Sequence, residues 1–170
     1  MGSEEHCIDD EIPFDIPECW AWARIFTVCK SISAGGDKPA KCLKTPSRDC
    51  NIPVLSNGEK NDGLFGYTDE ARIKEDSITI SARGTIGFSK VRRYPYCPIV
   101  RLISVIPADE IDIDYLQIVL SALLEKGVGT SIQQLTVPML SPKLIPIPPL
   151  CEQQSIAKHI KSLIPIIESL

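Results

Sequence analysis

Alternating polar and apolar residues in the middle of the chain predict a β-hairpin. Residues 76–81 alternate polar with β-branched side chains, and residues 86–91 begin a second strand of similar character. Residues 83–85, with the sequence Arg-Gly-Thr, would form the tip between them. A third strand is expected from Pro98 to Ile106, because this apolar run is closed by Pro107.

Farther along the chain the apolar spacing changes from two residues to three or four. From about Asp114 to Lys126 this spacing predicts a helix, which Asp112 or Asp114 can cap at its start and Gly127 at its end. Residues 138–149 are rich in proline and are expected to form extended edge structure.

A second helix is predicted from Glu152 to Leu170, directly after Pro148 and Pro149. Its apolar residues recur at alternating steps of four and three, which is the heptad spacing of a coiled coil. The residues of this seam are Ile156, Ile160, Leu163, Ile167 and Leu170. Pro165 interrupts the seam and can kink the helix. Either a partner helix or the chain's own domain can cover the seam.

Composition fits one globular domain. The 170 residues are 44% hydrophobic and 24% charged, and no apolar run approaches the ~18 residues of a membrane span. The acidic start has no apolar stretch behind it, which argues against a secretory signal and indicates the cytoplasm. Residues 31–63, rich in Ser, Gly, Pro and Asn, predict long loops. The expected organisation is an acidic tail (1–15), a folded domain (16–150) and the beginning of a long helix (151–170).

Cysteine and histidine spacing argues against a metal site and against nucleophilic catalysis. The seven cysteines are odd in number and no pair has the C-x₂-C spacing of a zinc site. The only histidines, His6 and His159, lie near opposite ends of the chain, so a Cys or Ser nucleophile has no evident base. Scattered reduced thiols and a chain without catalytic activity are therefore expected.

The net charge of −4 hides a strong segregation of charge along the chain. Residues 1–19 carry seven acids and no Lys or Arg. Residues 20–48 carry six basic residues and one acid, and residues 83–101 carry five basic residues and no acid. Each basic run alone can be a solvated face, but two of them in an acidic chain favour a surface that binds an anion and can collect phosphate contacts.

Three segments of the sequence carry motifs that can be compared with known families. DSITISARGTIGFSKV (76–91) is weak evidence alone, since hairpins of this kind are common. GTSIQQLTVPMLSPKLIPIPPLCEQQSIAKHI (129–160) is more specific, because a Pro-Ile-Pro-Pro strand precedes a Glu-Gln-Gln that opens the helix. With IPECWAWAR (16–24), these segments resemble the specificity (S) subunits of type I restriction-modification systems, and more narrowly their target-recognition domain, into which the last segment is similar to the usual entry.

The resemblance implies an α+β domain with a curved, largely antiparallel sheet and flanking helices, followed by a C-terminal coiled-coil helix that acts as a spacer or dimerisation helix. It also implies a non-catalytic chain that reads one half of a bipartite double-stranded DNA target and docks the modification (methyltransferase) subunit. S-adenosylmethionine would bind to that subunit, no cofactor is expected on this chain, and a separate restriction subunit would cleave.

The chain departs from the family in size. A typical S subunit has two recognition domains and two long helices, whereas this chain has one domain and the beginning of one helix. It is therefore either a fragment or a half-subunit, and a half-subunit would pair weakly with a second copy through the heptad seam.

Basic and amide side chains are the candidates for DNA contact. Arg83 suits a guanine edge through its bidentate fork, and Gln133 and Gln134 suit adenine. The remaining candidates are Lys38, Lys41, Lys44 and Arg48 for phosphates, Lys90, Arg92 and Arg93 for either role, and Thr85 at the hairpin tip. Arg83 can instead bridge carboxylates near its turn, and the glutamines can cap local loop structure.

Two other classes of function compete with DNA recognition. One is a protein-interaction module that uses the Pro-rich strand and the heptad helix. The other is a fragment of a DNA methyltransferase, but the sequence has no Asn-Pro-Pro-Tyr or Asp-Pro-Pro-Tyr motif and no Gly-x-Gly after a strand.

Overall fold

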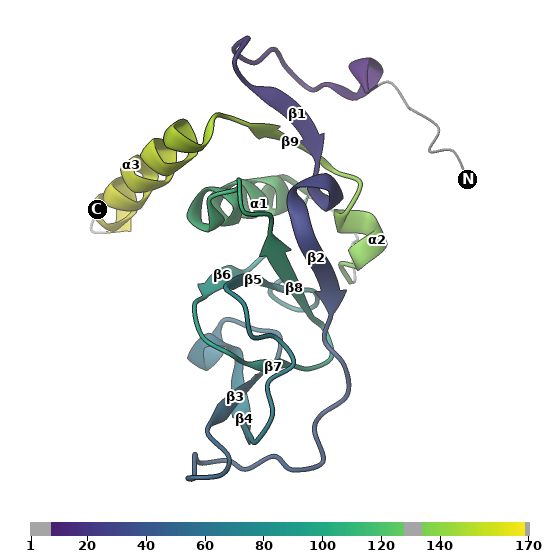
Figure 1. The fold of residues 1–170 in the computed structure, drawn as a ribbon, viewed down its shortest axis with the longest axis vertical. Helices are drawn as coiled ribbons and strands as arrows, with labels where there is room; N and C mark the ends of the chain where they lie inside the picture. Colours follow the sequence, from purple (N-terminus) through teal and green to yellow (C-terminus); the bar gives the residue numbers. More distant parts are fainter. Residues whose placement is uncertain (1–7, 128–133, 169–170) are drawn as a thin grey trace.

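Three small β-sheets and two long helices form the part of the chain that the computed structural model describes, residues 8–127 and 134–168 (Figure 1). The central sheet is antiparallel throughout, and its strands in spatial order are β2 (Cys29–Ala34), β8 (Leu102–Pro107), β5 (Ser77–Ser81) and β6 (Ser89–Arg92).

Two further sheets lie at opposite ends of the central one (Figure 1). One contains β4 (Leu64–Thr68), β3 (Ile52–Leu55) and β7 (Cys97–Pro98), and the other pairs β1 (Ala21–Arg24) with β9 (Leu144–Ile147). Among the described strands only β3 and β7 pair in parallel. The expected α+β class with largely antiparallel pairing is confirmed, although the strands are divided among three sheets.

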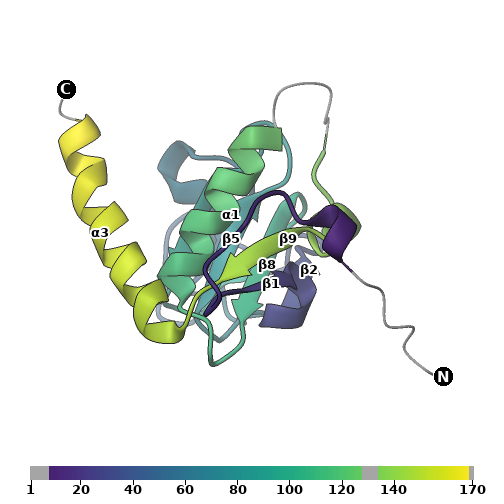
Figure 2. The same ribbon diagram turned by 90° about the horizontal axis from the view of Figure 1, so that it is seen from above.

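The main core lies between the central sheet and α1 (Ile113–Gly127), which packs against it (Figure 2). The register places buried isoleucines and valines opposite each other, because Ile78 pairs with Val105 and Ile80 with Ile103. The facing side chains of α1 recur every four residues and are Leu116, Leu120 and Leu124. Burial of each such side chain stabilises the fold by about 1.5–3 kcal/mol.

The helix α1 has the start that its sequence predicts. The Asp112 carboxylate accepts hydrogen bonds from the backbone N–H groups of Asp114 and Tyr115, at 3.0 and 2.9 Å. These are two of the four donors that a helix leaves unpaired at its N-terminus, so Asp112 is the N-cap.

The predicted hairpin is confirmed, because β5 and β6 pair antiparallel and are joined by residues 82–88. Its glycines meet backbone requirements that other residues satisfy poorly: φ is +78° at Gly84 and +92° at Gly87. The second strand begins at Ser89, three residues later than residue 86, where the alternating pattern places it.

The third predicted strand is wrong as one continuous element. The run from Pro98 to Ile106 is divided between β7 and β8, which belong to different sheets. Between them Leu102 N–H donates to the Ile99 carbonyl at 3.3 Å, and Arg101 has a φ of +70°. A tight turn therefore interrupts the apolar run.

The Pro-rich stretch from residue 138 to residue 149 is only partly extended. Its first part belongs to a short helix, α2 (Val137–Leu140), and its second part forms β9. Pro138 lies in the first turn of α2, where the missing N–H of proline leaves no helical hydrogen bond unmade.

The last helix, α3 (Leu150–Glu168), begins two residues before the predicted start and continues past Pro165. Its first turn is fixed to the domain by two side chains. The Trp20 indole N–H donates to the Glu152 carboxylate at 2.5 Å, and the buried Gln153 amide accepts from Asp112 N–H at 2.8 Å. Gln153 also donates to the Pro148 carbonyl at 2.9 Å.

The N-terminal segment contacts the domain from residue 11 onward. The guanidinium of Arg24, on β1, pairs with the Glu11 carboxylate at 2.7 Å, and the rings of Phe14 and Trp22 meet edge to face at 4.9 Å. The boundary at residue 15 between tail and domain stays a prediction.

All six cysteines in the described part of the chain are free thiols. Burial raises the pKa of the Cys29 thiol to about 12. No group of three potential metal ligands occurs within residues 8–127 and 134–168. None of the helices described there is long and apolar enough to cross a membrane.

Candidate nucleic-acid interface

Two backbone hydrogen bonds at Ala82, just beyond the end of β5, bring three separate segments together. Ala82 N–H donates to the Arg101 carbonyl at 2.9 Å, and Leu135 N–H donates to the Ala82 carbonyl at 2.8 Å. The segments joined in this way, here called the Ala82 junction, are Ala82–Arg83, Arg101 and Gln134–Leu135. The junction places the predicted base-reading residues Arg83 and Gln134 near each other.

The loop after β3 closes the junction from another side. The Asn57 side-chain amide donates to the Arg83 carbonyl at 2.9 Å, and Gly58 N–H donates to the Ser81 hydroxyl at 2.8 Å. These bonds fix the backbone and leave the Arg83 side chain exposed, without an ion pair to any described residue. The alternative in which Arg83 bridges carboxylates beside its turn therefore has no support in the described residues.

Thr85 is exposed at the tip of the same connection, and its carbonyl accepts from Phe88 N–H at 3.1 Å. Gln134 is also exposed, which leaves its amide accessible to a ligand. Gln133 lies outside the described residues.

A second group of cations surrounds the exposed ring of Phe65 on β4. The ammonium groups of Lys38 and Lys44 lie 5.4 and 4.6 Å from the ring centroid. Neither lysine pairs with a carboxylate among residues 8–127 and 134–168. We call Lys38, Lys44 and Phe65 the Phe65 cluster. Two unpaired ammonium groups around one ring form a local positive potential that suits a phosphate.

Arg48 and Lys41 belong to the same loop between β2 and β3 but differ in their contacts. Arg48 is exposed and makes no ion pair within the described ranges. Lys41 pairs with Asp69 at 3.1 Å, and this contact lowers the pKa of the Asp69 carboxyl. Lys90, on β6, likewise pairs with Asp62 at 2.5 Å and lowers its pKa. Exposed pairs contribute about 0–1 kcal/mol, so a phosphate can compete for either lysine.

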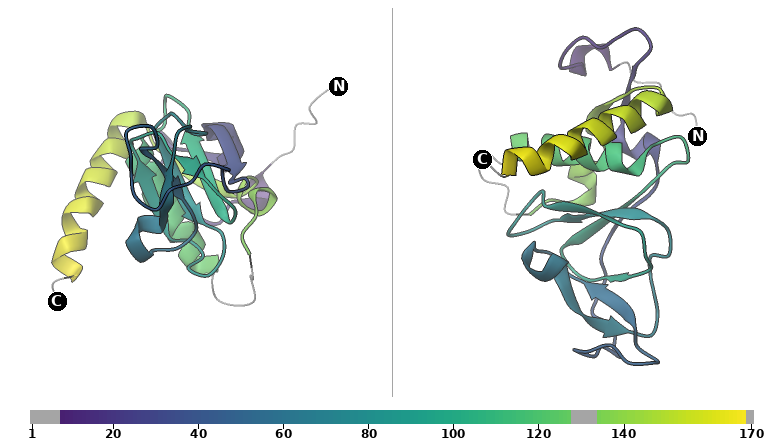
Figure 3. Two further views of the ribbon diagram at one scale, coloured as in Figure 1. Left: turned by 90° about the horizontal axis from the view of Figure 1, so that it is seen from below. Right: turned by 90° about the vertical axis from the view of Figure 1, so that its left-hand side faces the viewer.

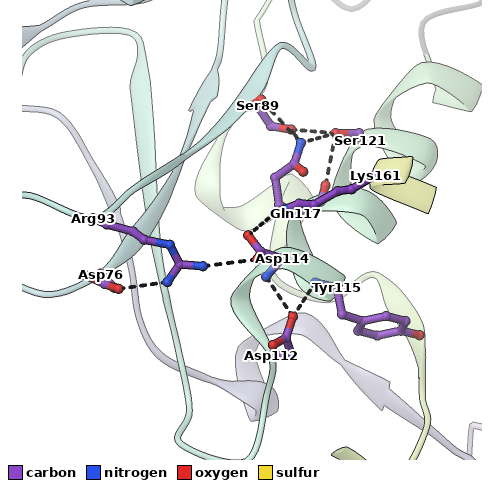
Figure 4. Close-up of polar contacts among 9 residues, drawn as sticks. All are labelled: Asp76, Ser89, Arg93, Asp112, Asp114, Tyr115, Gln117, Ser121 and Lys161. Carbon is purple, nitrogen blue, oxygen red and sulfur yellow. Dashed lines mark hydrogen bonds and ion pairs between the residues drawn. The ribbon is translucent and has the colours of Figure 1, made fainter. Parts of the chain in front are cut away.

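Arg93 lies at the opposite end of the hairpin from the Ala82 junction. Figure 4 shows the carboxylates that it contacts. Its guanidinium bridges Asp76 at 3.0 Å and Asp114 at 3.1 Å, and Asp114 also binds Lys161 of α3 at 2.7 Å. This network joins the start of β5, the end of β6, α1 and α3. The geometry separates Arg93 from the candidates in the Ala82 junction.

The assignment of Arg92 as a DNA contact is wrong. Its side chain is 3% exposed, and its guanidinium donates to the Thr79 hydroxyl, the Tyr94 hydroxyl and the Asp62 carbonyl at 3.0, 3.0 and 2.8 Å. All three guanidinium nitrogens are satisfied within the protein, so Arg92 supports the fold and is inaccessible to DNA.

The predicted heptad seam is divided between covered and exposed residues. Ile156 and Ile160 are half-buried and line an apolar cavity with Tyr115 and Ile118 of α1. Leu163 is 53% exposed. The side chain of Ile167 and all of Leu170 lie outside the described residues. The domain thus covers the first two positions of the seam and leaves the third accessible.

Sequence reasoning missed Arg101 of the Ala82 junction and Asn57, which donates a hydrogen bond to the junction. Asn57 is followed by Gly58, and this Asn-Gly pair is a turn signal that can be recognised in the sequence. Arg101 has no such signal, because it lies within an apolar run that fits a strand.

A family model for the type I restriction modification DNA specificity domain matches residues 17–170. Two Mycoplasma pneumoniae proteins that are named as type I specificity subunits are 39% and 38% identical to the chain over 136 and 130 residues. The alignments cover 80% and 76% of this chain, and 38% and 39% of those proteins.

Solved structures show the same fold at lower identity. The HsdS subunit of Thermoanaerobacter tengcongensis matches with a TM-score of 0.72 at 21% identity, over 92% of this chain and 40% of that one. A type I restriction-modification S subunit from M. genitalium matches with a TM-score of 0.71 at 15% identity, over 89% and 41%. The chain thus spans about 40% of the length of these relatives.

Proposed function

Because the chain belongs to the family of type I restriction modification DNA specificity domains, we propose that it binds double-stranded DNA and reads one half of a bipartite target sequence. Its own part in the reaction is recognition, and the chemistry belongs to partner subunits. The observation that supports this proposal is the Ala82 junction, where exposed Arg83 and exposed Gln134 each lie next to a residue of the Leu135–Ala82 backbone hydrogen bond.

The side chains of the Ala82 junction suit base edges in the major groove. A guanidinium can donate two parallel hydrogen bonds to O6 and N7 of guanine, and a glutamine amide can pair with N6 and N7 of adenine. A fixed backbone under these side chains lowers the entropy lost on binding, which favours discrimination between bases. Each such contact is worth about 1–3 kcal/mol of discrimination.

The Phe65 cluster and Arg48 suit the DNA backbone. They carry positive charge on a surface loop, and phosphate contacts of this kind position a protein on DNA without reading its sequence. Lys41 and Lys90 can join them when a phosphate replaces their carboxylate partners, Asp69 and Asp62.

Partners follow from the same proposal. The modification (methyltransferase) subunit docks on this chain, S-adenosylmethionine binds to that subunit, and a restriction subunit completes the complex in the cytoplasm. The exposed end of α3, with Leu163, Ile164 and Ile166 between 43% and 58% exposed, supports contact with a partner helix, including weak pairing with a second copy.

The test is fluorescence anisotropy of the chain on a random-sequence duplex pool at several salt concentrations, with sequencing of the bound fraction. We expect binding that weakens with salt and enrichment of a short motif. Arg83→Ala should relax the preference at one base position. Arg93→Ala is the matched control, since it removes an arginine from the opposite end of the same hairpin and should leave the motif unchanged.

The assay is repeated with the modification subunit if the isolated chain does not bind. Absence of salt-dependent, sequence-selective binding in both settings would contradict the proposed function. If Arg83→Ala and Arg93→Ala change the selected DNA motif equally, the Ala82 junction is not the site that reads the bases.

A further inference from the structure

Arg101 occupies a backbone conformation that an arginine adopts only reluctantly. It is the third residue of the tight turn Ile99–Leu102, and its φ is +70°. The left-handed region brings a side chain's Cβ close to the following carbonyl, so glycine or asparagine is usual at such a turn position. An arginine here therefore carries backbone strain.

Three neighbouring segments hold this turn in place. Ile99 N–H donates to the Leu55 carbonyl at 2.9 Å, Ala82 N–H donates to the Arg101 carbonyl at 2.9 Å, and Gly35 N–H donates to the Leu102 carbonyl at 2.7 Å. The Gly35 backbone lies so close that a Cβ on it would be 2.2 Å from the Ile99 carbonyl oxygen. The surroundings thus impose the conformation whatever residue stands at position 101.

The contacts of the Arg101 side chain do not explain why an arginine occupies this position. It is exposed, and it makes no hydrogen bond or ion pair with another described residue. A strained backbone that carries a solvent-exposed side chain indicates that this side chain serves the binding of another molecule and not the stability of the fold. Its backbone lies in the Ala82 junction, next to Arg83 and Gln134.

We propose that Arg101 is a specificity-determining residue that donates two hydrogen bonds to O6 and N7 of a guanine in the half-site. The fork of a guanidinium matches this edge, and the rigid turn limits the directions in which the side chain can reach. The neighbouring Val100 is 49% exposed, and an apolar side chain suits the methyl group of a thymine in the major groove better than a phosphate. This inference rests on the proposed DNA binding and adds the identity of one base in the half-site.

Arg101→Gly separates a recognition role from a structural one. Glycine adopts the left-handed conformation freely, so the melting temperature should be unchanged or higher. In the selection from the random duplex pool, the same variant should lose its preference for guanine at one position, roughly tenfold or more. Arg101→Lys keeps the charge but not the fork, so the salt dependence should be retained while the guanine preference is lost.

Asn61→Gly is the matched control, because Asn61 is another exposed residue with a positive φ, +54°. This variant should keep both its melting temperature and its base preference. If the wild-type protein and Arg101→Gly select the same motif, the inference is overturned, whether or not the melting temperature falls. The proposed reading of DNA by the chain would then still stand. If wild-type protein selects no motif even with the modification subunit, the proposed function fails, and this inference fails with it.

Discussion

Neighbouring arginines at the end of β6 have opposite environments. Arg92 is buried and hydrogen-bonded to Thr79, Tyr94 and the Asp62 carbonyl, whereas Arg93 is exposed and paired with two carboxylates. A buried guanidinium is tolerated only where its donors are paired, because removing it from water costs several kcal/mol. Arg92 therefore links the central sheet to the segment that leads into β4.

This difference predicts unequal effects of two alanine substitutions. Arg92→Ala should lower the free energy of unfolding by about 2–4 kcal/mol, because it leaves buried acceptors without partners and removes packing. Arg93→Ala should lower it by about 1 kcal/mol or less, since exposed ion pairs contribute little. Urea unfolding of the two variants and the wild type measures both values. Equal losses would show that the Arg92 side chain is not buried in solution.

The two arginines also show which residue roles can be recognised in a sequence. The need for Gly84 and Gly87 in the hairpin connection was predictable, because a positive φ is a local property of a turn. Which of two adjacent arginines points into the protein depends on the register between β5 and β6 and on the position of Asp62. Neither is visible in the order of residues, so the sequence predicts the same DNA-contacting role for Arg92 as for its neighbours.

At the scale of elements, the turn between β7 and β8 shows how tertiary contacts override a local pattern. Residues 98–106 have the β-branched composition of one strand, and the sequence predicts one. Backbone hydrogen bonds with Leu55, Ala82 and Gly35 instead fold Ile99–Leu102 into a turn. They outweigh a strain of about 1–3 kcal/mol at Arg101. Helices with regular apolar spacing, by contrast, were predicted to within a few residues.

The junction between the domain and α3 depends on one buried amide. Gln153 is 1% exposed, accepts from Asp112 N–H and donates to the Pro148 carbonyl, so it joins the start of α3 to the start of α1 and the end of β9. The Glu-Gln-Gln segment that resembles the family motif thus has a structural meaning: its first two residues fix how the helix leaves the domain.

We expect Gln153→Leu to reduce the free energy of unfolding by about 1–3 kcal/mol, because leucine fills a similar volume but leaves the Asp112 N–H and the Pro148 carbonyl without their partners. Gln154→Leu is the matched control, since Gln154 is exposed, and its effect should stay within ~0.5 kcal/mol. Thermal and urea unfolding provide the measurement. A loss at Gln154 as large as that at Gln153 would contradict the role of the buried amide.

Across the whole molecule, one network of ion pairs lies apart from the cations of the Ala82 junction and the Phe65 cluster. The pairs of Arg93, Lys161 and Lys30 gather where β5 begins, β6 ends and α1 begins. The cations of the Ala82 junction lie at the other end of the hairpin, and those of the Phe65 cluster lie on the three-stranded sheet. None of these cations forms an ion pair with a described residue, whereas Lys41, in the same loop as Lys38 and Lys44, pairs with Asp69. Figure 3 shows that this sheet extends away from α3 and β1 along the length of the molecule. An acidic chain can therefore present a basic surface to DNA.

This distribution predicts where a lysine contributes to the salt dependence of DNA binding. Each phosphate neutralised by a cation contributes about 0.9 to the slope of log K against log salt concentration. Lys44→Ala, in the Phe65 cluster, should therefore weaken binding to all sequences alike and reduce the magnitude of that slope by about 1. Lys158→Ala removes an exposed lysine from α3 and should leave both affinity and slope unchanged. Anisotropy titrations of one duplex at four or more salt concentrations give both quantities. Because the two variants change net charge equally, a larger effect of Lys44→Ala is due to its position, whereas equal effects would mean that DNA responds only to the total charge of the chain.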